Sequence, residues 1–211
     1  MNNSEENAIL SFERILFFSD AVFAIVITLL VLELKAPHLA REGFTESRLL
    51  GELVGLLPKF LGFVVSFFIV GMLWIEHHRI FRYIGDYDFG LIWRNLLFLL
   101  FVAFIPFPTA LFSENSHSKS AFMLYAGSFA LAALGKILVW RYAVSKRTQI
   151  IVPEASDQIV RSISRRSWAV PIACGAAILL APLAIAFGAI MFPFIPLIAN
   201  FLDRKPREGA A

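Results

Sequence analysis

The stretch from Arg14 to Lys35 reads RILFFSDAVFAIVITLLVLELK, and it decides how the rest of the sequence is interpreted. Its apolar part, from Leu16 to Leu34, is long enough to cross a bilayer, because an α-helix rises ~1.5 Å per residue and the hydrocarbon layer is ~30 Å thick. Polar groups interrupt the run at Ser19-Asp20, near its start, and at Thr28, near its centre. Polar groups are costly inside a membrane, so these positions indicate a role beyond anchoring.

The composition is that of an integral membrane protein. Of the 211 residues, 58% are hydrophobic and 22 are Phe, whereas a soluble domain is typically about half apolar. The net charge of +3 does not indicate nucleic-acid binding, because Lys and Arg cluster at the ends of apolar runs and in particular loops. The N-terminal segment lacks the pattern of a signal peptide, so we expect the first apolar run to be retained. The single cysteine, Cys174, is expected to be a small buried hydrophobe, without a disulfide or a metal cluster.

Six apolar segments predict an all-α integral membrane protein with six transmembrane helices in a single domain, residues 1–211. The predicted spans are residues 16–35, 49–76, 91–112, 121–142, 168–186 and 189–202, and residues 143–167 connect the fourth to the fifth. The last two spans share one apolar run, and we expect the turn between them near Phe187-Gly188. Gly and Pro residues predict a kinked or interfacial first part of the second span, and Pro106-Phe107-Pro108 a kink in the third.

The distribution of basic residues predicts the topology. With six spans, both termini and the loops at residues 77–90 and 141–167 lie on one side, and these segments hold most of the Lys and Arg. The positive-inside rule then places both termini in the cytoplasm. The second half of the segment from Ser145 to Ser167 predicts a basic amphipathic helix, which would either lie on the anionic inner leaflet or connect two spans in solvent.

One face of the first predicted helix carries large aliphatic residues and the central hydroxyl. At roughly 100° per residue, Thr28, Leu29 and Leu32 fall within roughly 60° of Ile25, whereas Asp20 lies roughly 140° away. Two explanations fit this stripe. It is an ordinary packing face, with Thr28 bonded to the carbonyl four residues back, or several copies of the helix line a pore. In a pore, the aliphatic residues would form a hydrophobic constriction and the hydroxyls a polar ring.

Asp20 needs a hydrogen-bond partner in the low dielectric of the membrane. Arg14 lies six residues earlier on a different face of the helix, so a direct pair within the helix is not expected. Donors at the same depth end the second span and begin the third: Trp74, His77, His78, Trp93, Arg94 and Asn95. We therefore expect a polar clamp between helices rather than a catalytic group.

The remaining polar residues of the apolar segments predict neither an enzyme nor a metal site. His77 and His78 lack further ligands, and the sequence shows no phosphate-binding loop and no catalytic Ser/His/Asp grouping. Lys59 and Lys136 lie inside apolar segments, and we expect both to extend their ammonium groups to an interface.

The polar residues of the first span also form a specific signature. Arg14, Phe18, Ser19 and Asp20 resemble the R-x-x-x-F-S-D motif that opens the first helix of the transmembrane protein 175 family of potassium-permeable channels. Further segments resemble the family in Ser66-Phe67, Trp74, His77-His78, Asn95-Leu96 and the run from Phe104 to Thr109. The resemblance extends to about residue 145, and the last two spans match only in length and hydrophobicity.

The resemblance implies six spans per subunit, a homotetramer and a pore lined by the first helix, without the T-V-G-Y-G filter of other potassium channels. It places the constriction at Ile25, Leu29 and Leu32 and gives Thr28 a part in selecting potassium over sodium. It implies an interhelical polar network of Arg14, Ser19, Asp20, Trp74, His77 and Asn95.

The predicted function is therefore a passive, potassium-selective channel. Its expected partners are three further copies of the chain, the lipid bilayer and potassium ions as the permeant species, with no cofactor and no nucleic acid. The alternative is a secondary transporter for cations or protons, which would show saturable, coupled flux that depends on Lys136 or Asp20. A third hypothesis is a non-conducting membrane scaffold, in which Asp20→Asn would alter assembly alone.

Overall fold

A computed structural model describes residues 3–37, 45–181 and 194–203, and within these ranges every regular element is a helix. Four segments are long and apolar enough to cross a membrane: Phe12–Val31, Leu57–Phe81, Phe89–Glu114 and Lys119–Ser145. The predicted all-helical, multi-pass architecture is therefore confirmed. The count of six spans stays a prediction, and the proposed turn at Phe187-Gly188 lies outside the described residues.

The first three helices are α1 (Asn3–Val31), α2 (Glu46–Gly55) and α3 (Leu57–Phe81). The predicted second span, residues 49–76, starts within α2, whereas the long helix starts at Leu57. Pro58 stands in the first turn of α3, where a missing N–H costs little, so the chain breaks between α2 and α3 at this point. The amphipathic α2 has no buried residue, in keeping with an interfacial position.

The third span is built from two helices, α4 (Phe89–Phe104) and α5 (Pro106–Glu114). The side chain of Asp88 caps α4 by accepting a hydrogen bond of 2.8 Å from the backbone N–H of Leu91. Pro106 cannot donate a backbone hydrogen bond, so α4 ends one residue before Ile105 and α5 begins directly after it. The break falls at the position where the sequence predicts a kink.

The longest core helix is α6 (Lys119–Ser145), which packs against α4 on one side and α9 on the other. Gly135 makes the close approach to α4 possible, because a Cβ atom at this position would lie 3.1 Å from the Cα atom of Phe98. Small residues at a helix interface let backbones approach in a membrane, where the hydrophobic effect does not drive helix association.

The C-terminal part comprises α7 (Arg147–Ile150), α8 (Asp157–Arg166), α9 (Ala169–Leu180) and α11 (Ile195–Asp203). The helix predicted in the second half of residues 145–167 is present as α8. Its apolar residues Val160 and Ile163 are buried, and the helix packs against α6 and α11. Neither a leaflet-bound nor a fully solvated helix describes α8, because the protein itself covers its apolar face. Cys174 is fully buried on α9, as predicted.

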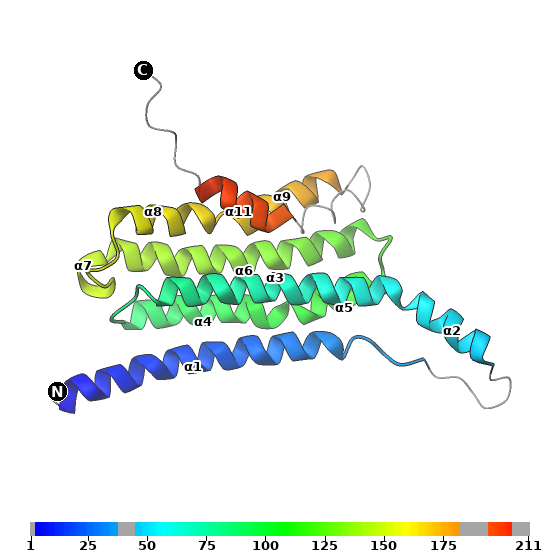
Figure 1. The fold of residues 1–211 in the computed structure, drawn as a ribbon, viewed down its shortest axis with the longest axis horizontal. Coiled ribbons are helices and arrows are strands. Elements are labelled where there is room, and N and C mark those ends of the chain that lie inside the picture. Colours follow the sequence, from blue (N-terminus) through cyan, green and yellow to red (C-terminus); the bar gives the residue numbers. More distant parts are fainter. Residues whose placement is uncertain (1–2, 38–44, 182–193, 204–211) are drawn as a thin grey trace, which may run out of the picture.

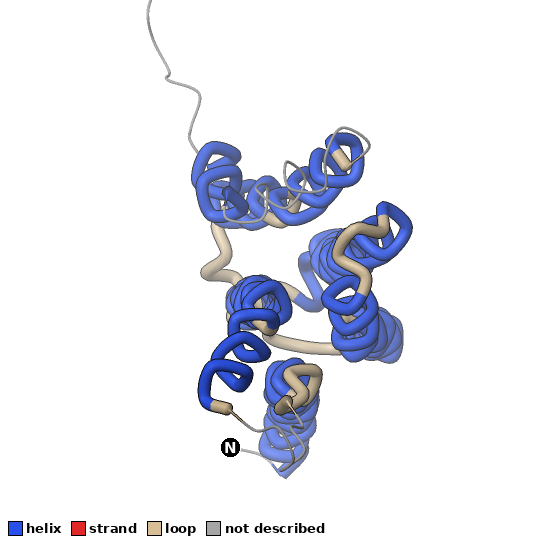
Figure 2. The backbone as a smooth tube through the Cα atoms, turned by 90° about the vertical axis from the view of Figure 1, so that its right-hand side faces the viewer, coloured by secondary structure: helices blue, strands red, loops and turns tan. Residues whose placement is uncertain are grey.

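The helices form layers (Figure 1). At one side, α1 packs against α3, α4 and α5, and at the opposite side lie α8, α9 and α11. The end-on view in Figure 2 shows the same order, with α3, α4 and α6 between these outer layers. The start of α1 lies at the same end of the bundle as α7, and α11 ends beside α8 (Figure 1).

Candidate functional site

The two faces of α1 differ in what covers them. Phe23, Val26 and Leu30 are at most 2% exposed and pack into the bundle. On the opposite face, Ile25 and Leu29 are 57% and 40% exposed and Thr28 is exposed too, and Leu32, in the turn directly after α1, is 67% exposed. The sequence-predicted stripe therefore points away from the subunit, and no other described part of the chain covers it.

The hydroxyl of Thr28 donates a hydrogen bond of 2.8 Å to the carbonyl oxygen of Ile25. The acceptor is three residues back, not four as the packing-face explanation assumed. A hydroxyl has one proton and two lone pairs, so this bond occupies the proton and leaves the oxygen able to accept. Thr28 therefore presents an oxygen acceptor on the exposed face, between two aliphatic residues.

A buried chain of hydrogen bonds joins α1 to α3 and α4. His77 Nε2 lies 3.0 Å from Asn95 Oδ1, and Asn95 Nδ2 donates to Ser19 Oγ at 3.0 Å. Ser19 in turn donates to the carbonyl oxygen of Ile15 at 2.9 Å. Because the Asn95 oxygen must accept, the proton of the imidazole sits on Nε2, and the three side chains, each at most 2% exposed, donate in one direction.

The second polar link of α1 lies nearer the surface. The indole Nε1 of Trp74 donates a hydrogen bond of 2.8 Å to the carboxylate of Asp20, and both residues are exposed. Arg14 lies one and a half turns before Asp20 and lines a hollow with Phe18 and Asn95. Among the described residues, no hydrogen bond or ion pair joins Arg14 to the other five members of the expected network.

The other donors considered for Asp20 have different partners. Arg94 donates to the carbonyl oxygen of Gly90 and stacks 3.9 Å above the ring of Tyr142. Trp93 is 57% exposed and His78 is exposed as well. The structure thus brings Ser19, Asp20, Trp74, His77 and Asn95 together and leaves Trp93, Arg94 and His78 outside.

An acidic cap stands just outside the membrane-spanning part of α4. The carboxylate of Asp88 accepts hydrogen bonds from Lys146 Nζ at 2.6 Å and from the Tyr142 hydroxyl at 2.7 Å, besides its bond to the backbone of Leu91. These bonds, that of Lys146 above all, lower the pKa of Asp88 to about 2. The same pairing raises the pKa of Lys146, so both groups stay charged and hold α4 to the end of α6.

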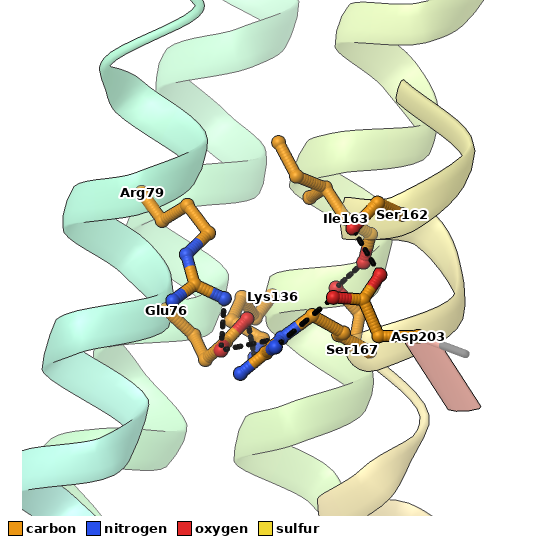
Figure 3. Close-up of polar contacts among 8 residues, drawn as sticks. Glu76, Arg79, Lys136, Ser162, Ile163, Ser167 and Asp203 are labelled. Carbon is orange, nitrogen blue, oxygen red and sulfur yellow. Dashed lines mark hydrogen bonds and ion pairs between the residues drawn. The ribbon is translucent and has the colours of Figure 1, made fainter. Parts of the chain in front are cut away.

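Sequence reasoning missed a cluster of charges between α3, α6, α8 and α11 (Figure 3). We expected Lys136 to extend to an interface, but its side chain is 1% exposed. Its Nζ lies 3.9 Å from Glu76 Oε2. Arg79 donates to the other oxygen of Glu76 at 3.1 Å, and Arg166 joins Glu76 to Asp203. The signal was available: Glu76 and Lys136 are charges of opposite sign near the same end of two predicted spans.

Sequence reasoning also missed a polar contact in the middle of the bundle. The Ser66 hydroxyl on α3 lies 3.0 Å from the Tyr125 hydroxyl on α6 and 3.3 Å from that of Thr109 on α5. These buried hydroxyls satisfy one another at a depth where water is absent. In the described parts of the chain, no group of three His, Cys, Asp or Glu side chains could hold a metal ion.

Comparison with known proteins adds to this geometry. Residues 14–106 match the family described as the endosomal/lysosomal potassium channel TMEM175. A potassium channel of Chamaesiphon minutus is 36% identical over 156 residues, which are 72% of this chain and 75% of that protein. A potassium channel of Streptomyces collinus is 32% identical over 205 residues, 94% of this chain and 97% of that protein.

An animal protein and a solved structure are similar as well. The endosomal/lysosomal proton channel TMEM175 of mouse is 31% identical over 157 residues, which are 70% of this chain but 31% of that protein. The crystal structure of a lysosomal potassium-selective channel TMEM175 homolog from Chamaesiphon minutus superposes with a TM-score of 0.77. It is 31% identical in sequence, and the match covers 92% of this chain and 99% of that one. These relatives are ion channels, not enzymes.

Proposed function

This chain belongs to the TMEM175 family, and from that premise we propose that it is a passive channel that conducts potassium in preference to sodium. The observation that carries the proposal is the orientation of α1. Its inner face packs into the subunit, and its outer face presents three exposed aliphatic side chains with Thr28 among them. An aliphatic face in lipid needs no hydroxyl, whereas a hydroxyl on a pore wall can replace part of the hydration shell of an ion.

The channel we propose is a homotetramer with α1 of each subunit beside the central axis. One subunit has a single copy of the stripe, and four copies around an axis would enclose a path between them. Ile25, Leu29 and Leu32 would form rings of apolar side chains, which restrict conduction by excluding water from the narrowest section. The Thr28 oxygens would form a ring of acceptors within that section and favour the more easily dehydrated potassium ion.

The polar chain has a positioning role in this proposal. The contacts of Ser19 with Asn95 and of Asp20 with Trp74 both lie on α1 before the stripe. They hold α1 at one rotation about its axis, and this rotation keeps Ile25 and Thr28 turned outward. Arg14 makes no hydrogen bond or ion pair with these groups in the described part of the chain, so we place it at the channel entrance on the side of the N-terminus, where it lines an open hollow with Phe18.

We also propose six spans and an orientation with both termini in the cytoplasm of an inner membrane. The end of the bundle that holds the start of α1 also holds the end of α3, with Arg79 in its last turn and Arg82 as its cap, and α7, with Arg147. The positive-inside rule assigns that end to the cytoplasm. Residues 168–202 would supply the fifth and sixth spans.

Flux through purified protein in liposomes tests the proposal. Potassium, sodium and proton gradients are applied in turn, because the animal relatives bear the name of proton channels. We expect non-saturating potassium flux that exceeds sodium flux, Ile25→Asn to increase conductance by wetting the constriction, and Thr28→Ala to reduce the preference for potassium. Phe17→Leu, on an exposed part of α1 outside the stripe, is the matched control.

Two results would contradict a passive channel. Saturable potassium flux that requires a second ion would favour the secondary transporter, and the absence of flux from assembled protein would favour a scaffold. A channel whose conductance and ion preference are unchanged by both stripe variants would place the ion path elsewhere.

A further inference from the structure

A pair of adjoining hollows lies on the side of the subunit opposite to α1, and we propose that together they bind an anionic phospholipid. The phosphate group would bind to arginine side chains of α3 and α8, and an acyl chain would enter the apolar hollow beside them. This inference concerns a surface far from the proposed pore. It does not require ion conduction, but the exposure of this surface to lipid rests on the proposed assembly around α1.

The first hollow, of about 500 Å³, lies between the end of α3 and α8. Arg79 and Arg82 contribute to its wall from α3, and Arg166 contributes from α8. Three guanidinium groups around one space suit a phosphate group, because each presents several N–H donors in a plane that matches two phosphate oxygens. Apolar side chains of both helices, such as Ile75 and Ile163, complete the wall.

The second hollow, of about 230 Å³, continues from the first toward the middle of the bundle and shares Ile75, Arg79 and Arg166 with it. Glu76 of α3 and Lys136 of α6 also line it. The rest of its wall is apolar and comes from α3, α9 and α11: Met72, Ala169, Val170, Ile195, Pro196 and Ala199. A basic hollow that leads into an apolar one matches a molecule with an anionic head and a hydrocarbon tail.

The charges around the hollows do not balance. Arg79, Arg82, Lys136 and Arg166 carry four positive charges, against two negative charges on Glu76 and Asp203, so two positive charges remain. Arg166 pairs with Asp203 through Nη1 at 3.2 Å, and its buried Nε faces Glu76 Oε1 at 3.8 Å without a hydrogen bond among the described residues. An anion in the first hollow would offset the excess positive charge.

The position of the hollows indicates which source of phosphate they meet. They lie against α8 and α11, across the bundle from α1 (Figures 1 and 2), so in an assembly around α1 they would face the surrounding lipid. They also lie at the end of the bundle that the positive-inside rule assigns to the cytoplasm, where anionic lipids attract basic groups. Free phosphate shares the head-group chemistry but leaves the apolar hollow empty.

Binding of the phospholipid is expected to attach the C-terminal helix α8 more strongly to α3. Arg166 of α8 is joined to α3 by ion pairing with Glu76 at 3.8 Å. A phosphate between Arg82 and Arg166 would add a second link between the same two helices, with full hydrogen bonds.

Native mass spectrometry of the detergent-purified protein measures the binding directly. Short-chain phosphatidylglycerol is titrated against phosphatidylcholine of the same chain length, with inorganic phosphate as a third arm. We expect phosphatidylglycerol to bind more tightly than phosphatidylcholine, and Arg82→Gln to weaken it roughly fivefold, since one basic residue at a membrane surface is worth ~1 kcal/mol. Arg161→Gln is the matched control, because Arg161 is exposed on α8 and lines neither hollow.

Further arms separate the sources of phosphate. Ala199→Leu narrows the apolar hollow. We expect it to weaken the binding of phosphatidylglycerol several-fold and to leave the binding of inorganic phosphate unchanged. Equal affinity for the two lipids, or equal losses in Arg82→Gln and Arg161→Gln, would overturn the site. Inorganic phosphate that binds as tightly as phosphatidylglycerol would overturn the assignment of a lipid.

Discussion

Replacement of Asn95 by Leu tests whether the buried polar chain fixes α1. The two side chains have similar volume, so Asn95→Leu removes the amide with little change in packing. It leaves His77 buried without the bond to Asn95, and an unsatisfied buried group costs ~1–3 kcal/mol. Ser19 keeps its bond to the Ile15 carbonyl and loses a bond of the kind worth ~0.6 kcal/mol between membrane helices. We expect a total loss of about 2–4 kcal/mol.

Reversible unfolding in mixed micelles with increasing dodecyl sulfate, followed by tryptophan fluorescence, measures this loss. The control replaces all three hydrogen-bonded side chains at once, in the triple variant Ser19→Ala, Asn95→Leu, His77→Phe. When all partners become apolar, none is left unsatisfied, so most of the lost stability should return. A single Asn95→Leu variant as stable as the wild type would refute the reasoning, and so would a triple variant no more stable than the single one.

Two other predictions concern charges at the same end of the bundle. Glu76→Gln leaves Lys136 buried without its nearest carboxylate, so we expect a loss of roughly 3–5 kcal/mol in the same assay, mostly recovered by adding Lys136→Met. The pKa of Asp88 is about 2 in the folded chain, below its unfolded value near 4. The ionised carboxylate therefore contributes its full stabilisation above pH ~4, and this stabilisation is lost as the pH falls through about 2. The difference in stability between wild type and Asp88→Asn should therefore be constant from pH 7 to 5 and shrink below pH 4. A constant difference down to pH 2.5 would contradict the assignment.

Much of the helical architecture was predictable, because apolar runs in a membrane protein have few alternatives to the helix. Backbone groups in lipid must bond within their own segment, so four long apolar runs became four long helices. Local chemistry also set the breaks, at Pro58 in the second run and at Pro106 in the third. The outward direction of Ile25 and Thr28 followed from helical periodicity alone, once one face of α1 was assigned to the bundle.

Contacts between helices that are distant in sequence were harder to predict. The partner of Asp20 was one of six candidates at the same depth, and nothing in the spacing of residues selects Trp74 among them. The burial of Lys136 was predicted wrongly because its environment is supplied by Glu76 on α3 and by α8, which lie far from it in sequence. A long side chain within an apolar run fits either an interface or an interior counter-charge, and only the packing decides.

The arrangement of α1 shows why a membrane helix of this kind needs polar contacts. Its buried positions Ser19, Phe23, Val26 and Leu30 follow a spacing of four, three and four residues, which defines one seam toward the bundle. From Ile15 to Val31, almost every other position of the helix is apolar too. Lipid is as apolar as the protein interior, so burial alone barely distinguishes one rotation from another. The bond from Asn95 to Ser19 does distinguish them, because a rotation of one residue, about 100°, would move the hydroxyl away from the amide. The hydrogen bond at Ser19, near the middle of α1, thus favours the rotation in which the aliphatic side chains one to three turns further on face outward.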